Sequence, residues 1–204
     1  LRPALNSPDF GCLYLHGFLS SPQSGKAQQT LDYFRQHYSP EQLLIPQLPF
    51  APADAAEVMQ ESLRELQQKF PRVMVIGSSL GGYYATWLSQ QYGIDAALIN
   101  PAVRPFDLFE HYLGPNEHYY SGEVHELTEV HIEQLRALYC EYINDPERLL
   151  LLLQTADETL DYRLAAAYYR QCPGWLEAGG DHSFQCYPQR LPMIMQWAAR
   201  HLSE

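Results

Sequence analysis

The chain has 204 residues and a net charge of −11 at pH 7, with 24 acidic and 13 basic side chains. Hydrophobic residues make up 46% and charged residues 18%, which is typical of a globular protein and unlike a disordered chain. The acidic balance argues against nucleic acids and anionic membrane surfaces as partners, because phosphate groups repel a chain of the same sign.

The length is that of one domain spanning residues 1–204. The sequence shows no secretory signal, and no apolar run approaches the ~18 residues that a membrane-spanning helix needs. None of Cys12, Cys140, Cys172 and Cys186 forms a C-x-x-C pair, so neither a zinc site nor a dithiol redox motif is indicated. We therefore expect a cytoplasmic protein without a metal or cofactor, and its oligomeric state stays open.

Short apolar runs with few charges alternate with longer segments of helical periodicity. The strand candidates are 11–15, 42–46, 73–76, 96–99, 149–154 and 175–177. The helix candidates are 53–70, 80–92, 160–171 and 189–202. Short apolar runs of this kind are typical of strands buried on both faces. The alternation predicts an α/β fold with a mostly parallel central sheet flanked by helices.

Residues 103–147 interrupt this alternation. The segment has helical patterns at 105–113 and 128–142, a polar middle and no clear strand. An insertion after a strand of a parallel sheet faces the ligand-binding edge of that sheet. We therefore expect a helical insert that could cover the site as a lid, against the alternative of a surface excursion without a gating role.

The sharpest motif is Gly77-Ser78-Ser79-Leu80-Gly81, which directly follows a strand candidate and directly precedes a helix candidate. A bare G-x-S-x-G is weak evidence, and the strand before it and the helix after it make it specific. The glycines allow the tight turn, and the helix N-terminus favours negative charge beside the serine. The pattern predicts that Ser79 is a nucleophile.

A serine nucleophile needs a base, and the base needs an orienting acid, which in this fold follow in the order serine, acid, histidine. His182 lies in a loop between the last strand candidate and the last helix candidate, where the base is expected. Asp157 is the first acid after the preceding strand candidate, with Glu158 and Asp161 as alternatives. For these two alternatives a role at a helix N-terminus is favoured.

An oxyanion formed on the substrate needs two backbone N–H donors. The N–H of Leu80, directly after the nucleophile, is one candidate, and that of Phe18, after the first strand candidate, is the other. Gly17 would let the backbone approach a substrate. His16 and Arg104 are further candidates for substrate binding, although a structural role for His16 and an ion pair within the fold for Arg104 are favoured.

Together these residues resemble the α/β-hydrolase superfamily and, more narrowly, the YqiA-like bacterial esterase family. The matching blocks are 14–18 (YLHGF), 46–49 (PQLP), 77–90 (GSSLGGYYATWLSQ), 100–106 (NPAVRPF), 154–162 and 179–184. The resemblance implies an α/β-hydrolase fold, hydrolysis of acyl esters or thioesters without a metal, and Ser79, Asp157 and His182 as the catalytic triad. Ala156 departs from the family pattern, in which glycine precedes the acid.

The residues and the resemblance lead to one expected function. It is a serine esterase that cleaves a small acyl ester in two steps through an acyl-enzyme. The alternatives are an acyl-CoA thioesterase and a binding protein that kept the fold without catalysis.

Overall fold

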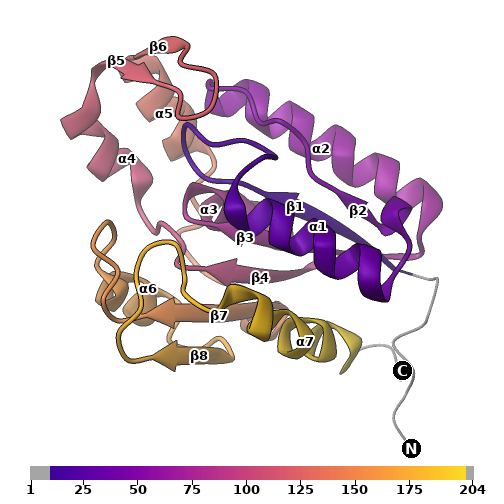
Figure 1. Ribbon diagram of the computed structural model, residues 1–204. Coiled ribbons are helices and arrows are strands. Elements are labelled where there is room, and N and C mark those ends of the chain that lie inside the picture. The colour runs from indigo at the N-terminus through magenta and orange to yellow at the C-terminus, as the bar shows by residue number, and fades with distance from the viewer. Residues whose placement is uncertain (1–9, 201–204) are drawn as a thin grey trace, which may run out of the picture.

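The computed structural model describes residues 10–200 and is built around a parallel six-stranded sheet (Figure 1). The strands lie in the order β2-β1-β3-β4-β7-β8. Their bounds are Phe10–Leu15 (β1), Leu43–Leu44 (β2), Arg72–Ser78 (β3), Asp95–Ile99 (β4), Leu149–Gln154 (β7) and Gly174–Glu177 (β8). All residues of β1 and β7 are buried, as expected for central strands covered on both faces.

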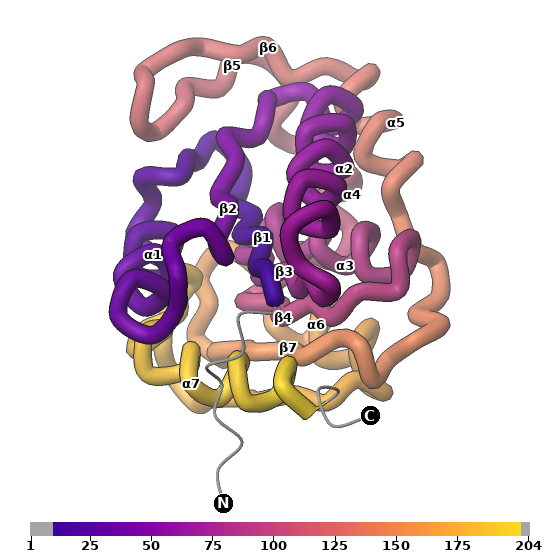
Figure 2. The backbone as a smooth tube through the Cα atoms, turned by 90° about the vertical axis from the view of Figure 1, so that its right-hand side faces the viewer, coloured from indigo at the N-terminus to yellow at the C-terminus, as the bar shows by residue number. Residues whose placement is uncertain are grey.

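Helices cover both faces of the sheet (Figures 1 and 2). Their bounds are Gly25–His37 (α1), Pro52–Lys69 (α2), Leu80–Tyr92 (α3), Pro105–Phe109 (α4), Glu129–Ala137 (α5), Tyr162–Tyr168 (α6) and Tyr187–Ala198 (α7). Successive strand residues belong to opposite cores: Leu13 and Leu15 pack with α2 and α3, whereas Cys12 and Tyr14 pack with α1 and α7. This alternation is the period of two expected for a strand buried on both sides.

Parallel pairing brings the carboxyl ends of distant segments to one edge of the sheet. Leu15 of β1 pairs with Gly77 of β3, and Ser78 of β3 pairs with Ile99 of β4. The loops that follow these strands therefore emerge side by side, as in other open α/β sheets that bind ligands at this edge.

The predicted α/β architecture is confirmed, with differences at element ends. β2 contains only two of the five residues predicted to be a strand. α6 begins at Tyr162, two residues later than predicted, because Asp161 caps it by accepting the N–H of Arg163. The prediction for the last helix extends to residue 202, and its final two residues lie outside the described residues.

Three elements, one helix and the two strands of a hairpin, were missed by the sequence analysis. Helix α1 was not among the predicted elements, and it buries only Ala27, Thr30 and Phe34 along one face. The expectation of no strand within the insert was wrong, because β5 (Gly114–Glu117) and β6 (Val124–Leu127) form an antiparallel hairpin. Each strand has four residues, and of these eight residues only Leu127 is buried, so the apolar run that marks a buried strand is absent.

The helical part of the insert packs into the core instead of standing away from it. Ile132 and Leu135 of α5 are buried in the cluster that covers the α2–α3 face of the sheet, as is Leu127 at the end of β6. The hydroxyl group of Tyr83, on α3, donates to the carbonyl oxygen of Leu135 at 2.6 Å. The insert is thus fixed to the body of the protein through α5.

The close backbone approach at Gly81, at the carboxyl edge of the sheet, predicts an effect on stability. A Cβ at Gly81 would lie 2.1 Å from the carbonyl oxygen of Leu15 and 2.7 Å from that of His16, both backbone atoms of a central strand and its loop. We expect Gly81→Ala to lower the free energy of unfolding by about 2 kcal/mol or more, as overpacking does. The measurement is urea denaturation followed by circular dichroism.

Gly25→Ala is the matched control, because a Cβ at Gly25, the first residue of α1, meets no atom within 4 Å. Its effect should stay within about 1 kcal/mol and can be stabilising, since alanine restricts the unfolded chain. Equal unfolding midpoints for the two variants would contradict the close approach at Gly81.

Candidate active site

Ser79 lies on the turn between β3 and α3 in a strained backbone conformation, with φ 57° and ψ −119°. A Cβ at Gly77 would lie 2.1 Å from the carbonyl oxygen of Gly81, so the turn needs glycine. The strained residue is held from both sides: its N–H donates to the carbonyl oxygen of Ile99 at 3.0 Å, and its carbonyl oxygen accepts the N–H of Ala102 at 3.0 Å. The turn therefore has the strand–turn–helix geometry of a nucleophile elbow.

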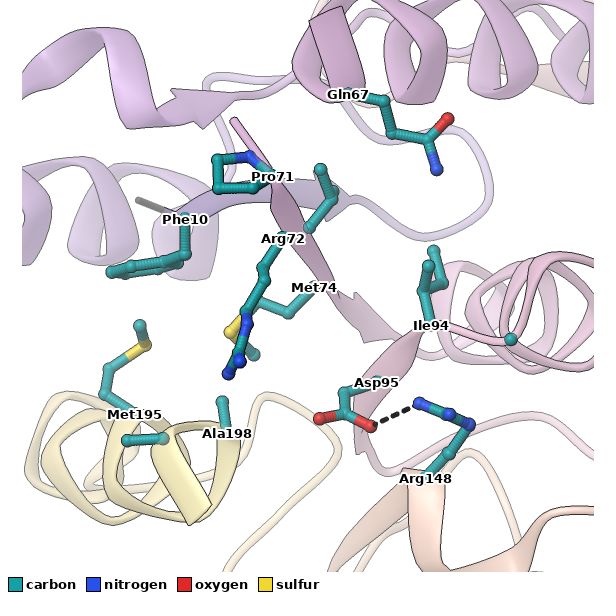
Figure 3. A pocket seen from close by; sticks show the side chains of 13 residues that line it. Phe10, Gln67, Pro71, Arg72, Met74, Ile94, Asp95, Arg148, Met195 and Ala198 are labelled. Carbon is teal, nitrogen blue, oxygen red and sulfur yellow. Dashed lines mark hydrogen bonds and ion pairs between the residues drawn. The ribbon is translucent and has the colours of Figure 1, made fainter. Parts of the chain in front are cut away.

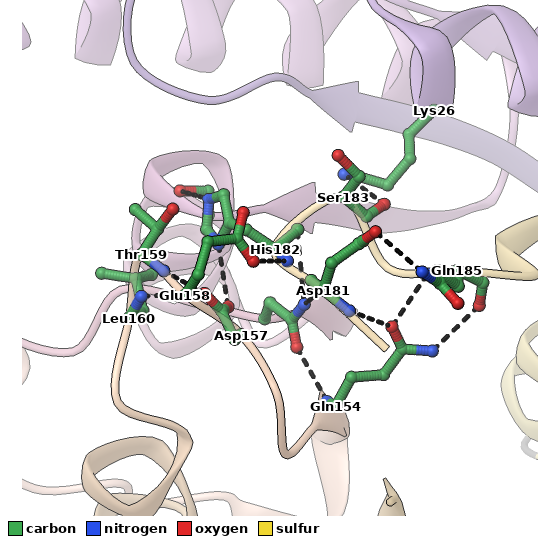
Figure 4. A network of polar contacts seen from close by, with 12 residues as sticks. Lys26, Gln154, Asp157, Glu158, Thr159, Leu160, Asp181, His182, Ser183 and Gln185 are labelled. Carbon is green, nitrogen blue, oxygen red and sulfur yellow. Dashed lines mark hydrogen bonds and ion pairs between the residues drawn. The ribbon is translucent and has the colours of Figure 1, made fainter. Parts of the chain in front are cut away.

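The imidazole ring of His182 lies between Ser79 and Asp157. Its Nε2 is 3.0 Å from Ser79 Oγ, and its Nδ1 is 2.8 Å from Asp157 Oδ2, a contact drawn in Figure 4. An ionised carboxylate can only accept a hydrogen bond, so Nδ1 carries the hydrogen and Nε2 is free to accept the serine hydroxyl. The arrangement brings together the three side chains that the sequence analysis selected from distant segments.

Both oxygens of Asp157 have donors. Its Oδ1 accepts the backbone N–H groups of Thr159 and Leu160, each at 2.8 Å, while Oδ2 contacts His182. The carboxylate is only 2% exposed, and burial alone would raise its pKa. The hydrogen bonds outweigh burial and hold the pKa of Asp157 below its usual value. The carboxylate therefore stays charged at neutral pH and fixes the orientation of the ring.

The two alternative acids have other roles. Glu158 Oε2 accepts the backbone N–H of His182 at 2.9 Å, so it supports the loop that carries the imidazole. Asp161 is the N-cap of α6 and pairs with Arg163, which agrees with the helix N-terminal role favoured from the sequence. The predicted N-terminal role of Glu158 is wrong, because Glu158 precedes the cap of α6 and bonds to a different loop.

Two buried amide side chains fix the His182 loop, residues 178–186 between β8 and α7. The sequence analysis did not single them out. Asn100, after β4, donates from Nδ2 to the carbonyl oxygen of Asp181 at 3.0 Å and accepts the N–H of Gln154 at 3.0 Å. Gln154, the last residue of β7, accepts the N–H groups of Asp181 and Gln185 at 3.2 and 2.8 Å (Figure 4). Each amide follows a buried apolar run, and that change from apolar to polar is the signal that could have identified it.

The two predicted oxyanion donors belong to segments beside Ser79. Leu80 is the first residue of α3, so its N–H has no partner within the helix. Phe18 lies in the loop after β1, and this loop passes close to the serine: a Cβ at Gly17 would lie 3.4 Å from the Cβ of Ser79. Gly17, Phe18, Leu80 and Ser79 line one cavity.

The structure gives His16 a structural role. Its Nε2 accepts the N–H of Leu48 at 3.1 Å, which leaves Nδ1 to donate to the carbonyl oxygen of Gly17 at 3.0 Å. The ring is buried, and burial lowers its pKa, so the neutral form is favoured. With both nitrogens bonded to backbone, His16 is corrected from a tentative substrate contact to a residue that pins the loop after β1.

Arg104 is also corrected, because it is not among the residues that line the cavity with Ser79. Its Nε donates to Asp107 Oδ2 at 2.5 Å, and its guanidinium lies 4.9 Å from the centre of the Phe106 ring. The side chain is 51% exposed. This is the ion pair within the fold that the sequence analysis weighed against substrate binding.

The cavity beside Ser79 has a volume of about 730 Å³ and lies between the loop after β1, the insert and the His182 loop. Aromatic side chains from the insert form one wall: Phe109, Tyr112, Tyr119 and Tyr120. Lys26 of α1 also lines the cavity, and its Nζ donates to the carbonyl oxygen of Ser183 at 2.9 Å. Burial lowers the pKa of Lys26 to about 8. The sequence analysis did not identify this lysine.

A second cavity, of about 270 Å³, lies at the other end of the sheet and is lined by Phe10, Arg72 and Met195 (Figure 3). Arg148 and Asp95, which also line it, form an ion pair at 3.5 Å. Within residues 10–200, no group of three or more histidine, cysteine, aspartate or glutamate side chains is placed to hold a metal ion. Over the same residues, no helix is both long and apolar enough to cross a bilayer.

Solved structures of low sequence identity share this fold. A protein from Agrobacterium vitis S4 that has been proposed to be a hydrolase is 19% identical, with 97% of this chain and 90% of that chain covered and a TM-score of 0.74. Est1E from Butyrivibrio proteoclasticus is 12% identical, with coverages of 99% and 92% and a TM-score of 0.70. The esterase Pf2001 from Pyrococcus furiosus is 14% identical, with coverages of 96% and 82% and a TM-score of 0.65.

These similarities establish the α/β-hydrolase fold. Residues 11–199 match the family described as "Uncharacterised protein family (UPF0227)", which is the YqiA-like family. The match covers most of the chain and includes Ser79, Asp157 and His182. The chain therefore belongs to the UPF0227 family, which confirms the family resemblance drawn from its motifs.

Proposed function

We propose that this chain is a serine hydrolase that cleaves acyl esters through an acyl-enzyme. The observation that carries the proposal is the continuous hydrogen-bonded line from Ser79 Oγ through His182 to Asp157, with contacts of 3.0 and 2.8 Å. Ser79, at one end of this chain of hydrogen bonds, lies on a strained turn and lines a cavity that could hold a substrate. The esterases among proteins of the same fold are consistent with this chemistry.

The proposed reaction has two steps. Ser79 Oγ attacks the carbonyl carbon of the ester while His182 Nε2 takes the hydroxyl proton, and the N–H groups of Leu80 and Phe18 bind the oxyanion. The ester C–O bond then breaks, the alcohol leaves with the proton from Nε2, and the acyl group stays on the serine. Water attacks this acyl-enzyme, gives its proton to Nε2, and the acid is released as Ser79 regains its hydrogen.

The substrate class follows from the cavity. Its aromatic wall favours an apolar or aromatic part of a substrate next to the reacting carbonyl. Est1E, one of the proteins of the same fold, has been solved with ferulic acid bound, so an aromatic ester belongs in the substrate panel. An acyl-CoA thioester is the alternative substrate, and ligand binding without turnover is the alternative function.

The proposed setting is the cytoplasm. Cys12, Cys140, Cys172 and Cys186 are all free thiols in the structure, as in a reducing compartment. The proposed partner is a small acyl ester or thioester. Neither a nucleic acid nor an anionic membrane surface is proposed as a partner, because the net charge is −11.

Two of the thiols are poor candidates for a rival nucleophile. Burial raises the pKa of the Cys140 and Cys172 thiols to about 11 and opposes their reaction as nucleophiles.

Replacing the nucleophile tests the proposal directly. We expect Ser79→Ala to lower kcat for p-nitrophenyl esters by about 10⁴-fold or more, because no other hydroxyl contacts His182 Nε2 in the described residues. The same variant should lose covalent labelling by a fluorophosphonate probe. Ser78→Ala is the control for the neighbouring hydroxyl. Full turnover by Ser79→Ala with an unchanged circular dichroism spectrum would reject the assignment of the nucleophile.

The choice of acid has its own test. Asp157→Asn should lower kcat by on the order of 10³–10⁴-fold, because an amide can no longer hold the Nδ1–H tautomer of His182. Asp161→Asn is the matched control, since Asp161 caps α6 and was an alternative acid in the sequence analysis. A large loss in Asp161→Asn with little loss in Asp157→Asn would exchange the two roles.

The pH profile should show no titration of the acid in the range where a free aspartate ionises. Because hydrogen bonds hold the pKa of Asp157 below its usual value, its carboxylate stays ionised as the pH falls through that range and keeps orienting the His182 ring. We expect the plot of log(kcat/KM) against pH for a neutral ester to show no additional downward bend between about pH 5 and pH 4. An extra unit of slope over that range would mean that the carboxylate titrates there.

A further inference from the structure

The turn of the insert hairpin, residues 118–123, contacts the loop that follows β1 through two hydrogen bonds. His118 Nε2 donates to the carbonyl oxygen of Ser20 at 2.8 Å, and the backbone N–H of Tyr119 donates to the carbonyl oxygen of Leu19 at 3.1 Å. The two bonds join segments about 100 positions apart in the sequence, since the His118–Ser20 pair is separated by 98 residues. The hairpin is thus attached to the loop that carries Phe18.

The tautomer of His118 can be deduced from its other partners. Its Nδ1 accepts the backbone N–H groups of Tyr120 and Ser121, at 3.3 and 3.2 Å. Because Nδ1 accepts, Nε2 carries the hydrogen and the bond to Ser20 is a donated one. One neutral imidazole therefore organises the hairpin turn with one nitrogen and reaches the loop after β1 with the other.

The loop after β1 is fixed on both sides of Phe18. On the strand side, His16 bonds to the carbonyl oxygen of Gly17 and to the N–H of Leu48. On the other side, Leu19 has φ 53°, a conformation that a branched side chain rarely adopts, and its carbonyl oxygen is the one that accepts from the hairpin. The bonds to the hairpin therefore hold a strained residue directly after Phe18.

The side chain of Phe18 is also held by the insert. Its ring centre lies 4.5 Å from that of Phe109 in the insert and 5.6 Å from that of Phe50. Phe50 in turn stacks on His125 of β6, with ring centres 4.7 Å apart and an interplanar angle of 11°. Backbone and side chain of the same loop are therefore fixed by the same insert.

We propose that His118 is a positioning residue, which through its bond to Ser20 keeps the N–H of Phe18 aimed at the oxyanion of the substrate. This role rests on the proposed function, in which Phe18 is one of two oxyanion donors. A donor acts in catalysis only where it is preorganised at the place where charge develops, so a loop free to turn away would lose that contribution. The hairpin then serves as part of the catalytic support, in addition to being a wall of the cavity.

Three variants separate the two functions of the ring. His118→Asn keeps an acceptor near the position of Nδ1 but has no atom that reaches Ser20, whereas His118→Gln places an amide donor near the position of Nε2. His118→Ala removes both. We expect kcat for p-nitrophenyl butyrate to fall by about 10-fold in His118→Asn and His118→Ala with KM within about 2-fold, since a displaced donor is a smaller loss than a deleted one. His118→Gln should recover most of this kcat.

The rate of labelling by a fluorophosphonate should follow kcat through the series, because phosphonylation of Ser79 also develops charge on an oxygen beside the same donors. His111→Asn is the matched control: His111 is an exposed histidine of the insert for which the structure gives no contact with the loop after β1. It should keep the kcat and the labelling rate of the unmodified chain.

Hydrogen exchange at the backbone amide of Tyr119 measures how firmly the hairpin turn is bonded to the loop after β1, and it does not depend on catalysis. Exchange should be faster in His118→Asn than in the unmodified chain, and slowed again in His118→Gln. Full kcat in His118→Asn, or a kcat in His118→Gln as low as in His118→Asn, overturns the positioning role and leaves the proposed function intact. An unmodified chain that neither hydrolyses esters nor takes up the fluorophosphonate overturns both, even where exchange at Tyr119 responds as expected.

Discussion

The arrangement depends on one constraint, the close approach of three backbone segments at the carboxyl edge of the sheet. There the start of α3 nearly touches both its own strand and the end of β1, and no side chain fits at Gly77 or Gly81. This approach fixes the direction of the Ser79 side chain, because the residue can occupy its φ of 57° only while β4 and the segment after it hold its N–H and its carbonyl oxygen. The position of Ser79 is thereby set, and the loop that carries His182 is fixed separately by Asn100 and Gln154.

The sequence was sufficient for features that are local. The elbow could be predicted because a buried strand, two glycines and a helix are adjacent in the chain, and the position of His182 follows from the order of elements in the fold. The role of Asn100 and Gln154 could not be predicted, since it depends on β4 and β7 being neighbours in the sheet and on both facing the His182 loop. The hairpin was missed for a similar reason: its strands are short and exposed, and its stability comes from partners elsewhere.

The insert has two parts that differ in their attachment to the fold. Its helix α5 belongs to the core, because Ile132 and Leu135 are buried there and Tyr83 bonds to the carbonyl oxygen of Leu135. Moving α5 as a lid would expose these side chains, at a cost of about 1.5–3 kcal/mol for each. The hairpin is held at β6 by Leu127 in the core and by His125 on Phe50, whereas its turn, residues 118–123, has mainly exposed residues, such as Tyr119 at 76%, and is attached by two hydrogen bonds. Any opening of the cavity by the insert is therefore least costly at this turn.

The distribution of backbone strain provides an argument for the site that is independent of the distances between its side chains. In residues 10–200, the non-glycine residues with positive φ are Leu19, Ser79, Asn100, Phe184 and Cys186. All of them lie in the loops at the carboxyl edge of the sheet, and each costs on the order of 1–3 kcal/mol that the rest of the fold must offset. Leu19, Ser79, Phe184 and Cys186 line the cavity beside Ser79, and Asn100 bonds to the loop that carries His182. Strained residues persist only where the surrounding structure over-determines them, and they cluster at functional sites, so their distribution favours this edge of the sheet as the site.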